Sequence, residues 1–271
     1  MGPIGVFDSG YGGLTILEAF QRHLPQYDYL YLGDNARTPY GSRSFNVVYE
    51  YTLEAVRYLF GRGCPLVILA CNTASAKALR SIQQLDLPKI DPDRRVLGIL
   101  RPTVEALDKI TRSRHIGLLG TEGTIQSGSY PIEIHKLYPD IHVVSKACPM
   151  WVPLVECGEH HSAGADFFVQ KYLDELFAQD PKIDTLVLGC THYPLLIDSI
   201  RKFVPETVQI VKQGDLVAKS LENYLLRHPE METRCEKNGQ TQYLTTEASK
   251  KFEDMASVFS HGKISVSQVK L

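Results

Sequence analysis

The chain has 271 residues, of which 44% are hydrophobic and 22% are charged, a composition typical of one large or two ordinary globular domains. Its 29 basic and 31 acidic side chains give a formal charge of −2, so no excess of positive charge favours nucleic acid or an anionic membrane as a partner. No apolar stretch approaches the ~18 residues of a membrane span, and the first residues lack the basic and apolar regions of a secretory signal.

Short apolar runs alternate with longer amphipathic stretches along most of the chain. Apolar residues recur every three or four positions at 48–59 and at 169–176, which predicts helices there. This alternation predicts an α/β protein with parallel sheets. The predicted strands are, in chain order, 4–7, 29–32, 66–70, 96–100, 116–119, 141–144, 185–188 and 208–211, followed by a helix at 220–226 and weaker strand signals at 242–246 and 264–269.

Two pairs of segments resemble each other at nearly constant offsets. IGVFDSG at 4–10 corresponds to IGLLGTEGT at 116–124, and LVILACNTA at 66–74 corresponds to TLVLGCTHY at 185–193. Chance similarity between apolar strands is the alternative explanation. The repeat predicts two doubly wound α/β lobes related by pseudo-twofold symmetry, with the active site in the cleft between them. The first lobe would comprise residues 1–98 plus 210–271, and the second lobe residues 99–209.

Polar residues and glycines follow the first predicted strand in FDSGYGGL at 7–14. Thr15 stands where a dinucleotide fingerprint needs glycine, Asp8 would repel a pyrophosphate, and no P-loop lysine follows. Asp8 or Ser9 could cap a helix while the glycines allow a tight bend. Because Asp8 also ends a strand, where open α/β sheets bind ligands, it is a site candidate. The loop GDNARTPYGSRS at 33–44 is either a well-formed turn or an anion site made of backbone amides.

The six cysteines, at 64, 71, 148, 157, 190 and 235, predict reduced thiols in a cytoplasmic protein. Cys71 ends a strand and is followed by natural helix-capping residues, and a helix N-terminus lowers the pKa of a nearby thiol. Cys190 repeats this arrangement with Thr191 and His192. If the two lobes face each other, the two thiols approach one cleft from opposite sides.

Two other chemistries are possible for these cysteines and histidines. Cys157 with His160 and His161 looks like part of a metal site, but zinc needs three or four converging ligands and no second cluster of matching spacing occurs. Cys190 and His192 could form a nucleophile and its base, which leaves the thiol of the first lobe without a role.

Opposed thiols suit the inversion of a stereocentre by proton transfer. This reaction needs a base on one face of the carbon and an acid on the other, and a thiolate and a thiol can exchange these roles. A model thiol has a pKa near 8.5, so modest tuning populates either form at neutral pH. Asp8 and His192 would tune the two thiols.

The motifs together resemble a known family. FDSGYGGL, GDNARTPYG, LACNTA, GTEGTIQSGSY, CPMWVPLVE and LGCTHYPLL occur in that order between about residues 4 and 200, and they resemble the glutamate racemases of the aspartate/glutamate racemase superfamily. The resemblance implies an enzyme that interconverts L- and D-glutamate for bacterial peptidoglycan synthesis and needs neither cofactor nor metal. Many members are dimers, so it also implies a homodimer as the assembly to test.

The resemblance places the family's functional residues on particular positions of this chain. Its two catalytic cysteines fall on Cys71 and Cys190. The chain departs from the family pattern at 212–214, where many members carry an Asp-Ser-Gly-like stretch, and in a slightly long segment at 89–96. Rival functions are aspartate racemisation and amino-acid binding without chemistry. The substrate-contacting residues fall on Asp8, Ser9, Tyr40, Gly41, Asn72, Thr73, Thr191 and His192, with Asp34 and Glu156 as supporting acids.

Overall fold

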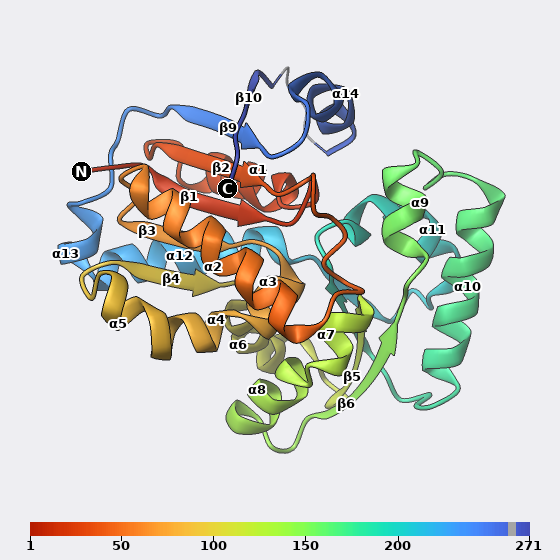
Figure 1. Ribbon diagram of the computed structural model, residues 1–271. Coiled ribbons are helices and arrows are strands. Elements are labelled where there is room, and N and C mark those ends of the chain that lie inside the picture. The colour runs from red at the N-terminus through yellow and green to blue at the C-terminus, as the bar shows by residue number, and fades with distance from the viewer. Residues whose placement is uncertain (260–263) are drawn as a thin grey trace.

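Two parallel β-sheets form the centre of the computed structural model, which describes residues 1–259 and 264–271 (Figure 1). The larger sheet has the strand order β10-β9-β2-β1-β3-β4, and the smaller sheet has the order β6-β5-β7-β8. The strands are β1 (Ile4–Asp8), β2 (Tyr29–Gly33), β3 (Leu66–Leu69), β4 (Arg95–Gly98), β5 (His115–Gly120), β6 (His142–Ala147), β7 (Thr185–Gly189), β8 (Gln209–Val211), β9 (Thr241–Thr245) and β10 (Val266–Gln268).

The same strand order occurs in both sheets. Strands β2-β1-β3-β4 of the larger sheet correspond to β6-β5-β7-β8 of the smaller one, and every named strand pairing is parallel. The two segment pairs that resemble each other in the sequence therefore lie on corresponding strands, β1 with β5 and β3 with β7. The α/β fold with two parallel sheets, predicted from the sequence, is confirmed.

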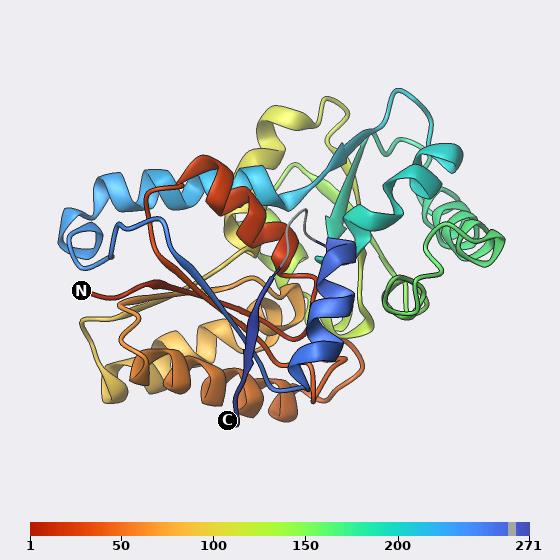
Figure 2. The same cartoon turned by 90° about the horizontal axis from the view of Figure 1, so that it is seen from above.

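Helices cover both faces of the larger sheet. Seen from above, the orange and yellow helices α2 to α5 lie on one face, and α1 (red) and α12 (light blue) lie on the other (Figure 2). The helices are α1 (Leu14–His23), α2 (Phe45–Gly61), α3 (Asn72–Lys77), α4 (Leu79–Ser81), α5 (Leu87–Ile90), α6 (Leu100–Ile110), α7 (Glu122–Gln126), α8 (Ser129–Leu137), α9 (Trp151–Glu156), α10 (Ala163–Phe177), α11 (Ile197–Phe203), α12 (Gln213–Arg227), α13 (Pro229–Glu232) and α14 (Ser249–Phe259), with a π-helix η1 (Ile82–Asp86) and a 3-10 helix η2 (Tyr193–Leu196).

Alternate residues of a buried strand enter different apolar layers. Val6 of β1 packs in the same cluster as Leu17 of α1 and Leu221 of α12, whereas Phe7 packs with Val48 of α2. This is the two-residue period of a strand, and it explains why β1 is buried on both faces and reads as an unbroken apolar run. The first of these clusters continues into the smaller sheet, so the two sheets share one core.

Two of the eight strands predicted first have a boundary that differs from the structure by two residues or more. The predicted strand at 96–100 ends at Gly98, and Leu100 begins α6, where Leu100, Val104 and Leu107 are buried at helical spacing. The apolar run crosses from strand to helix, so periodicity over five residues could not separate the two. The predicted strand at 141–144 begins one residue later and continues to Ala147. Among the described residues, no helix combines the length and the apolarity that crossing a membrane requires.

Candidate active site

A cavity of about 190 Å³ lies where strands of both sheets end. Ser9 and Cys71 follow β1 and β3 of the larger sheet, and Thr121 and Cys190 follow β5 and β7 of the smaller sheet. Carboxyl ends of parallel strands are where such sheets bind ligands. Apart from Asp8, the substrate-contacting and catalytic residues predicted from the sequence all line this cavity: Ser9, Tyr40, Gly41, Cys71, Asn72, Thr73, Cys190, Thr191 and His192.

Cys71 is held at the start of α3 by its own sulfur. Its Sγ accepts a hydrogen bond from Ala74 N at 3.4 Å and lies 3.4 Å from Ser9 Oγ, to which it donates. The cysteine itself therefore caps the helix, and the two following residues, which the sequence suggested as caps, form the first turn. Burial and then the charge of Asp8 raise the pKa of the Cys71 thiol to about 12, so it is protonated at neutral pH.

Cys190 faces a histidine that is paired with a carboxylate. Cys190 Sγ lies 3.9 Å from His192 Nδ1, and His192 Nε2 lies 3.0 Å from Glu156 Oε1. Burial disfavours the imidazolium, but the contacts with Cys190 and Glu156 outweigh burial and raise the pKa of His192 to about 10. At neutral pH a positive charge therefore lies beside the Cys190 sulfur, an arrangement that activates cysteine thiols.

Asp8 connects the ends of β1 and β7. Its Oδ1 accepts a hydrogen bond from Gly10 N at 2.9 Å, and its Oδ2 accepts one from Thr191 Oγ1 at 3.4 Å. Burial raises the pKa of the Asp8 carboxyl. Gly12 of the same turn is needed for close approach, because a Cβ there would lie 2.2 Å from Thr191 Oγ1 and 2.6 Å from His192 Nδ1. The glycine therefore allows the turn after β1 to lie directly against the residues that follow β7.

The loop after β2 closes one side of the cavity. Tyr40 OH donates a hydrogen bond to Asp34 Oδ2 at 2.5 Å, and Arg37 Nε donates to the same oxygen at 2.7 Å. Asp34 is fully buried, so it holds the loop in place behind the residues that face the cavity. Gly41 O accepts a hydrogen bond from Gly123 N at 2.7 Å, which joins this loop to α7 next to the smaller sheet.

Comparison with protein families matches residues 14–221 to the Asp/Glu/Hydantoin racemase model. The chain belongs to this family. The glutamate racemase of Geobacter metallireducens is 39% identical over 262 residues, which cover 96% of this chain and 93% of that protein. A glutamate racemase isoform of Bacillus anthracis has a similar structure, with a TM-score of 0.90, 36% identity and coverage of 100% of this chain and 98% of that chain.

A second similar structure contains a bound ligand. The glutamate racemase of Francisella tularensis, solved in complex with D-glutamate, matches with a TM-score of 0.88 and 31% identity over 99% of this chain and 97% of that chain. The family resemblance that the motifs predicted is thereby confirmed.

The departure from the family pattern at 212–214 brings a glutamine into the wall behind the site. Gln213 Oε1 accepts a hydrogen bond from Asn72 Nδ2 at 2.6 Å, and Gln213 Nε2 donates to Tyr130 OH at 2.7 Å and to Thr103 Oγ1 at 2.8 Å. Tyr130 OH donates in turn to Asn72 Oδ1 at 2.7 Å. All four side chains are buried, so the network fixes Asn72 at the cavity wall from α6, α8 and α12.

Replacing Gln213 by leucine should lower the free energy of unfolding by about 2–4 kcal/mol, because each buried polar group left without a partner costs ~1–3 kcal/mol. Leucine keeps a similar volume, so the loss reports the hydrogen bonds and not a cavity. Urea unfolding of this variant and of the exposed control Gln209→Leu would measure the effect. Equal stability of Gln213→Leu and the wild type would show that the network does not hold Asn72.

Several lining residues were not singled out from the sequence. Thr38, Thr121 and Cys148 line the cavity, and all three lie in motifs quoted for the family resemblance, which was the available signal. Thr121 Oγ1 lies 2.9 Å from Thr73 Oγ1 of α3. Within the described part of the chain, Cys157 does not group with two histidines as metal ligands, and its side chain is exposed.

Proposed function

We propose that the protein is a glutamate racemase that inverts the α-carbon by proton transfer between Cys71 and Cys190. One observation supports this most directly: the two cysteines follow corresponding strands of two different sheets and line the same cavity. A substrate between them would present opposite faces of its α-carbon to the two sulfurs. The D-glutamate product would supply peptidoglycan synthesis.

The two sulfurs begin a turnover in different protonation states. In the proposed mechanism Cys190 acts as the thiolate that removes the α-proton from one enantiomer, with the His192 imidazolium beside it. Cys71, with its raised pKa, is the thiol that donates a proton to the opposite face. The electron pair left on the α-carbon takes up the new proton, so Cys71 ends as the thiolate and Cys190 as the thiol. The opposite enantiomer binds this second form, and the same steps run in reverse.

The cavity wall offers neutral donors for the two carboxylates and the amino group of glutamate. Hydroxyls of Ser9, Thr73 and Thr191 and the amide of Asn72 line the cavity, and no arginine or lysine is among the described lining residues. We infer that hydroxyls and backbone amides bind the carboxylates. One methylene distinguishes glutamate from aspartate and gives only ~1–3 kcal/mol of discrimination, so aspartate is the alternative substrate.

A cysteine hydrolase would use part of the same geometry. Cys190, His192 and Glu156 form a thiol–imidazole–carboxylate chain of the kind that activates nucleophiles. Such an enzyme gives no role to Cys71 in the opposite wall. The racemase proposal uses both thiols.

When pure protein is incubated with L-glutamate, the optical rotation of the glutamate should fall to zero. This should occur without pyridoxal phosphate and in the presence of a chelator. In the proposed mechanism both proton-transfer groups belong to the chain, so neither an added cofactor nor a metal takes part in the proton transfers. A parallel incubation with L-aspartate measures the substrate preference. Loss of racemisation after exhaustive chelation, with recovery on adding metal, would contradict the mechanism, and inversion of aspartate alone would change the assigned substrate.

A further inference from the structure

Two histidines and an aspartate meet at the end of the smaller sheet that lies away from the cavity. His115 is the first residue of β5, His142 is the first residue of β6, and the strand register pairs them directly. Asp180 lies between α10 and β7 and is buried. One ligand atom from each of the three lies within 4.8 Å of the others. Since β5 rises ~3.3 Å per residue, its length separates this cluster from the cavity by roughly 16 Å.

We propose that His115, His142 and Asp180 bind a divalent transition-metal ion such as Zn²⁺. Asp180 Oδ2 lies 2.6 Å from His115 Nδ1 and 3.7 Å from His142 Nε2, so a single carboxylate oxygen faces both rings. Ligand atoms around tetrahedral zinc are about 3.3 Å apart, because each lies ~2.0–2.2 Å from the metal. Moving the His115 ring by less than an ångström, with the metal replacing the proton it shares with Asp180, gives that spacing between His115 and Asp180.

The second carboxylate oxygen of Asp180 already has a hydrogen-bond partner in the chain. Its Oδ1 accepts a hydrogen bond from Lys182 N at 2.9 Å, which leaves Oδ2 to face the histidines. Outer contacts of this kind orient metal ligands and strengthen binding. The His142 side chain is 60% exposed, so an ion entering from solvent could keep a water molecule in its fourth position.

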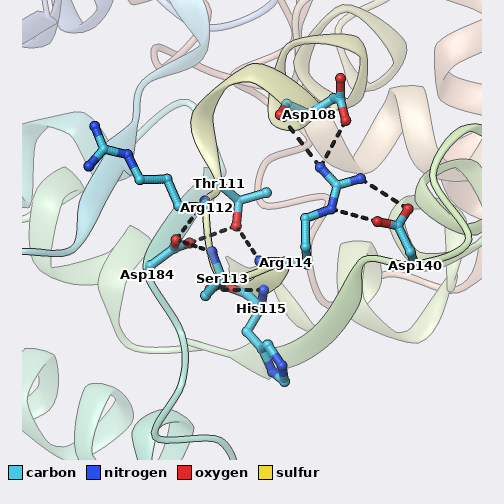
Figure 3. A network of polar contacts seen from close by, with 8 residues as sticks. All are labelled: Asp108, Thr111, Arg112, Ser113, Arg114, His115, Asp140 and Asp184. Atoms are coloured by element: carbon cyan, nitrogen blue, oxygen red, sulfur yellow. Dashed lines mark hydrogen bonds and ion pairs between the residues drawn. The ribbon is translucent and has the colours of Figure 1, made fainter.

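A polar network fixes the start of β5, where His115 is located (Figure 3). The carboxylate of Asp184 accepts hydrogen bonds from the backbone N–H groups of Arg112 and Ser113, at 2.7 and 2.6 Å, and from Thr111 Oγ1 at 2.7 Å. These contacts hold the turn that leads into the strand. The His115 ring points away from this network (Figure 3), and its Nδ1 contacts Asp180 Oδ2.

Arg114 holds the starts of β5 and β6 together. Its guanidinium bonds to Asp140, two residues before His142, at 2.7 and 3.0 Å and to Asp108 Oδ1 at 2.8 Å. Arg114 has a φ of +66°, which costs a non-glycine residue roughly 1–3 kcal/mol and persists where surrounding contacts impose it. The neighbouring contacts thus fix the backbone at both histidines before any ion binds, which reduces the ordering cost of binding.

The donor set selects the class of ion. Two imidazoles and one carboxylate suit Zn²⁺, Co²⁺ or Ni²⁺, whereas Mg²⁺ and Ca²⁺ prefer oxygen ligands alone. The ion would tie the loop between α10 and β7 to β5 and to the edge strand β6. Its role is therefore to stabilise the smaller sheet, apart from the chemistry in the cavity.

The test is calorimetric titration of the full chain, without a histidine tag, with Zn²⁺. All proteins carry Cys157→Ser, which removes the exposed thiol as a competing ligand. We expect one equivalent to bind to the parent, and His142→Asn to weaken that binding by about 100-fold, because loss of a ligand should cost at least as much as loss of a supporting contact. The exposed histidine variant His135→Asn is the matched control and should bind as the parent does.

Two further measurements keep the outcome decisive if a variant folds poorly. Co²⁺ should give a tetrahedral spectrum without a thiolate charge-transfer band, which separates this site from the cavity cysteines. Zn²⁺ should raise the melting temperature of the parent and of His135→Asn, but not that of His115→Asn or His142→Asn. Racemisation by His142→Asn should stay unchanged. Absence of saturable binding by the parent, equal affinity of His142→Asn and His135→Asn, or a thiolate band would overturn the site.

Discussion

Alanine in place of Cys71 or Cys190 is expected to reduce racemisation to the background rate, because each sulfur serves a face of the α-carbon that the other cannot reach. The remaining thiol could exchange the α-proton of one enantiomer, but it could not complete the inversion. Polarimetry with L- and D-glutamate measures the loss. Cys64→Ala is the matched control, since Cys64 is another buried thiol, lies just before β3 and does not line the cavity. The turnover of this variant should stay near that of the wild type.

Heavy water separates the two-thiol mechanism from a mechanism with one base. Early in the reaction the product enantiomer should carry deuterium at the α-carbon, since its proton comes from a thiol that exchanges with solvent. The recovered substrate should remain largely unlabelled, because the thiol that removed its proton does not return a solvent proton to the same face. Equal labelling of substrate and product, or full racemisation by either alanine variant, would refute the assigned roles.

The architecture was predictable because the sheets are parallel and their central strands β1, β3 and β7 are buried on both faces. Such strands read as unbroken apolar runs between helical patterns, and their polar carboxyl ends mark the site, as Asp8, Cys71 and Cys190 did. The prediction failed where apolar character continues from one element into another, as from β4 into α6. There the residues of the strand and of the helix start are equally apolar, and only the tertiary contacts decide where the strand ends.

Residues whose importance depends on contacts between distant segments could not be found by spacing. Gln213 is 141 positions from Asn72, and it is visible in the sequence only as a departure from a family pattern. His115 and His142 meet because the register of β5 and β6 pairs them, and Asp180 joins them from a loop. No local motif encodes that register. Spacing along the chain therefore indicated a possible metal site at Cys157 and its neighbouring histidines, and it did not indicate one at these three residues.

Replacing His192 by asparagine is expected to lower turnover about 10²–10⁴-fold, the usual effect of removing one positioned acid–base group. Asparagine keeps a polar side chain of moderate size but cannot carry the positive charge that lies 3.9 Å from the Cys190 sulfur. The two enantiomers have equal free energy in water, so kcat/KM must fall equally in both directions. The individual kcat and KM values are free to differ, since the charge acts on Cys190, whereas Cys71 lies near the carboxylate of Asp8.

The pH profile distinguishes a charge effect from a loss of packing. The pKa of His192 is raised to about 10, so its imidazolium is present at neutral pH and is lost as the pH rises through about 10. Wild-type turnover should therefore fall above that pH. Glu156→Gln removes one of the contacts that raise the pKa and should move this decline to lower pH while leaving turnover at pH 6 less affected than His192→Asn does. If the decline stays at the same pH in Glu156→Gln, the carboxylate does not set the charge of His192, and its pairing with the ring is structural only.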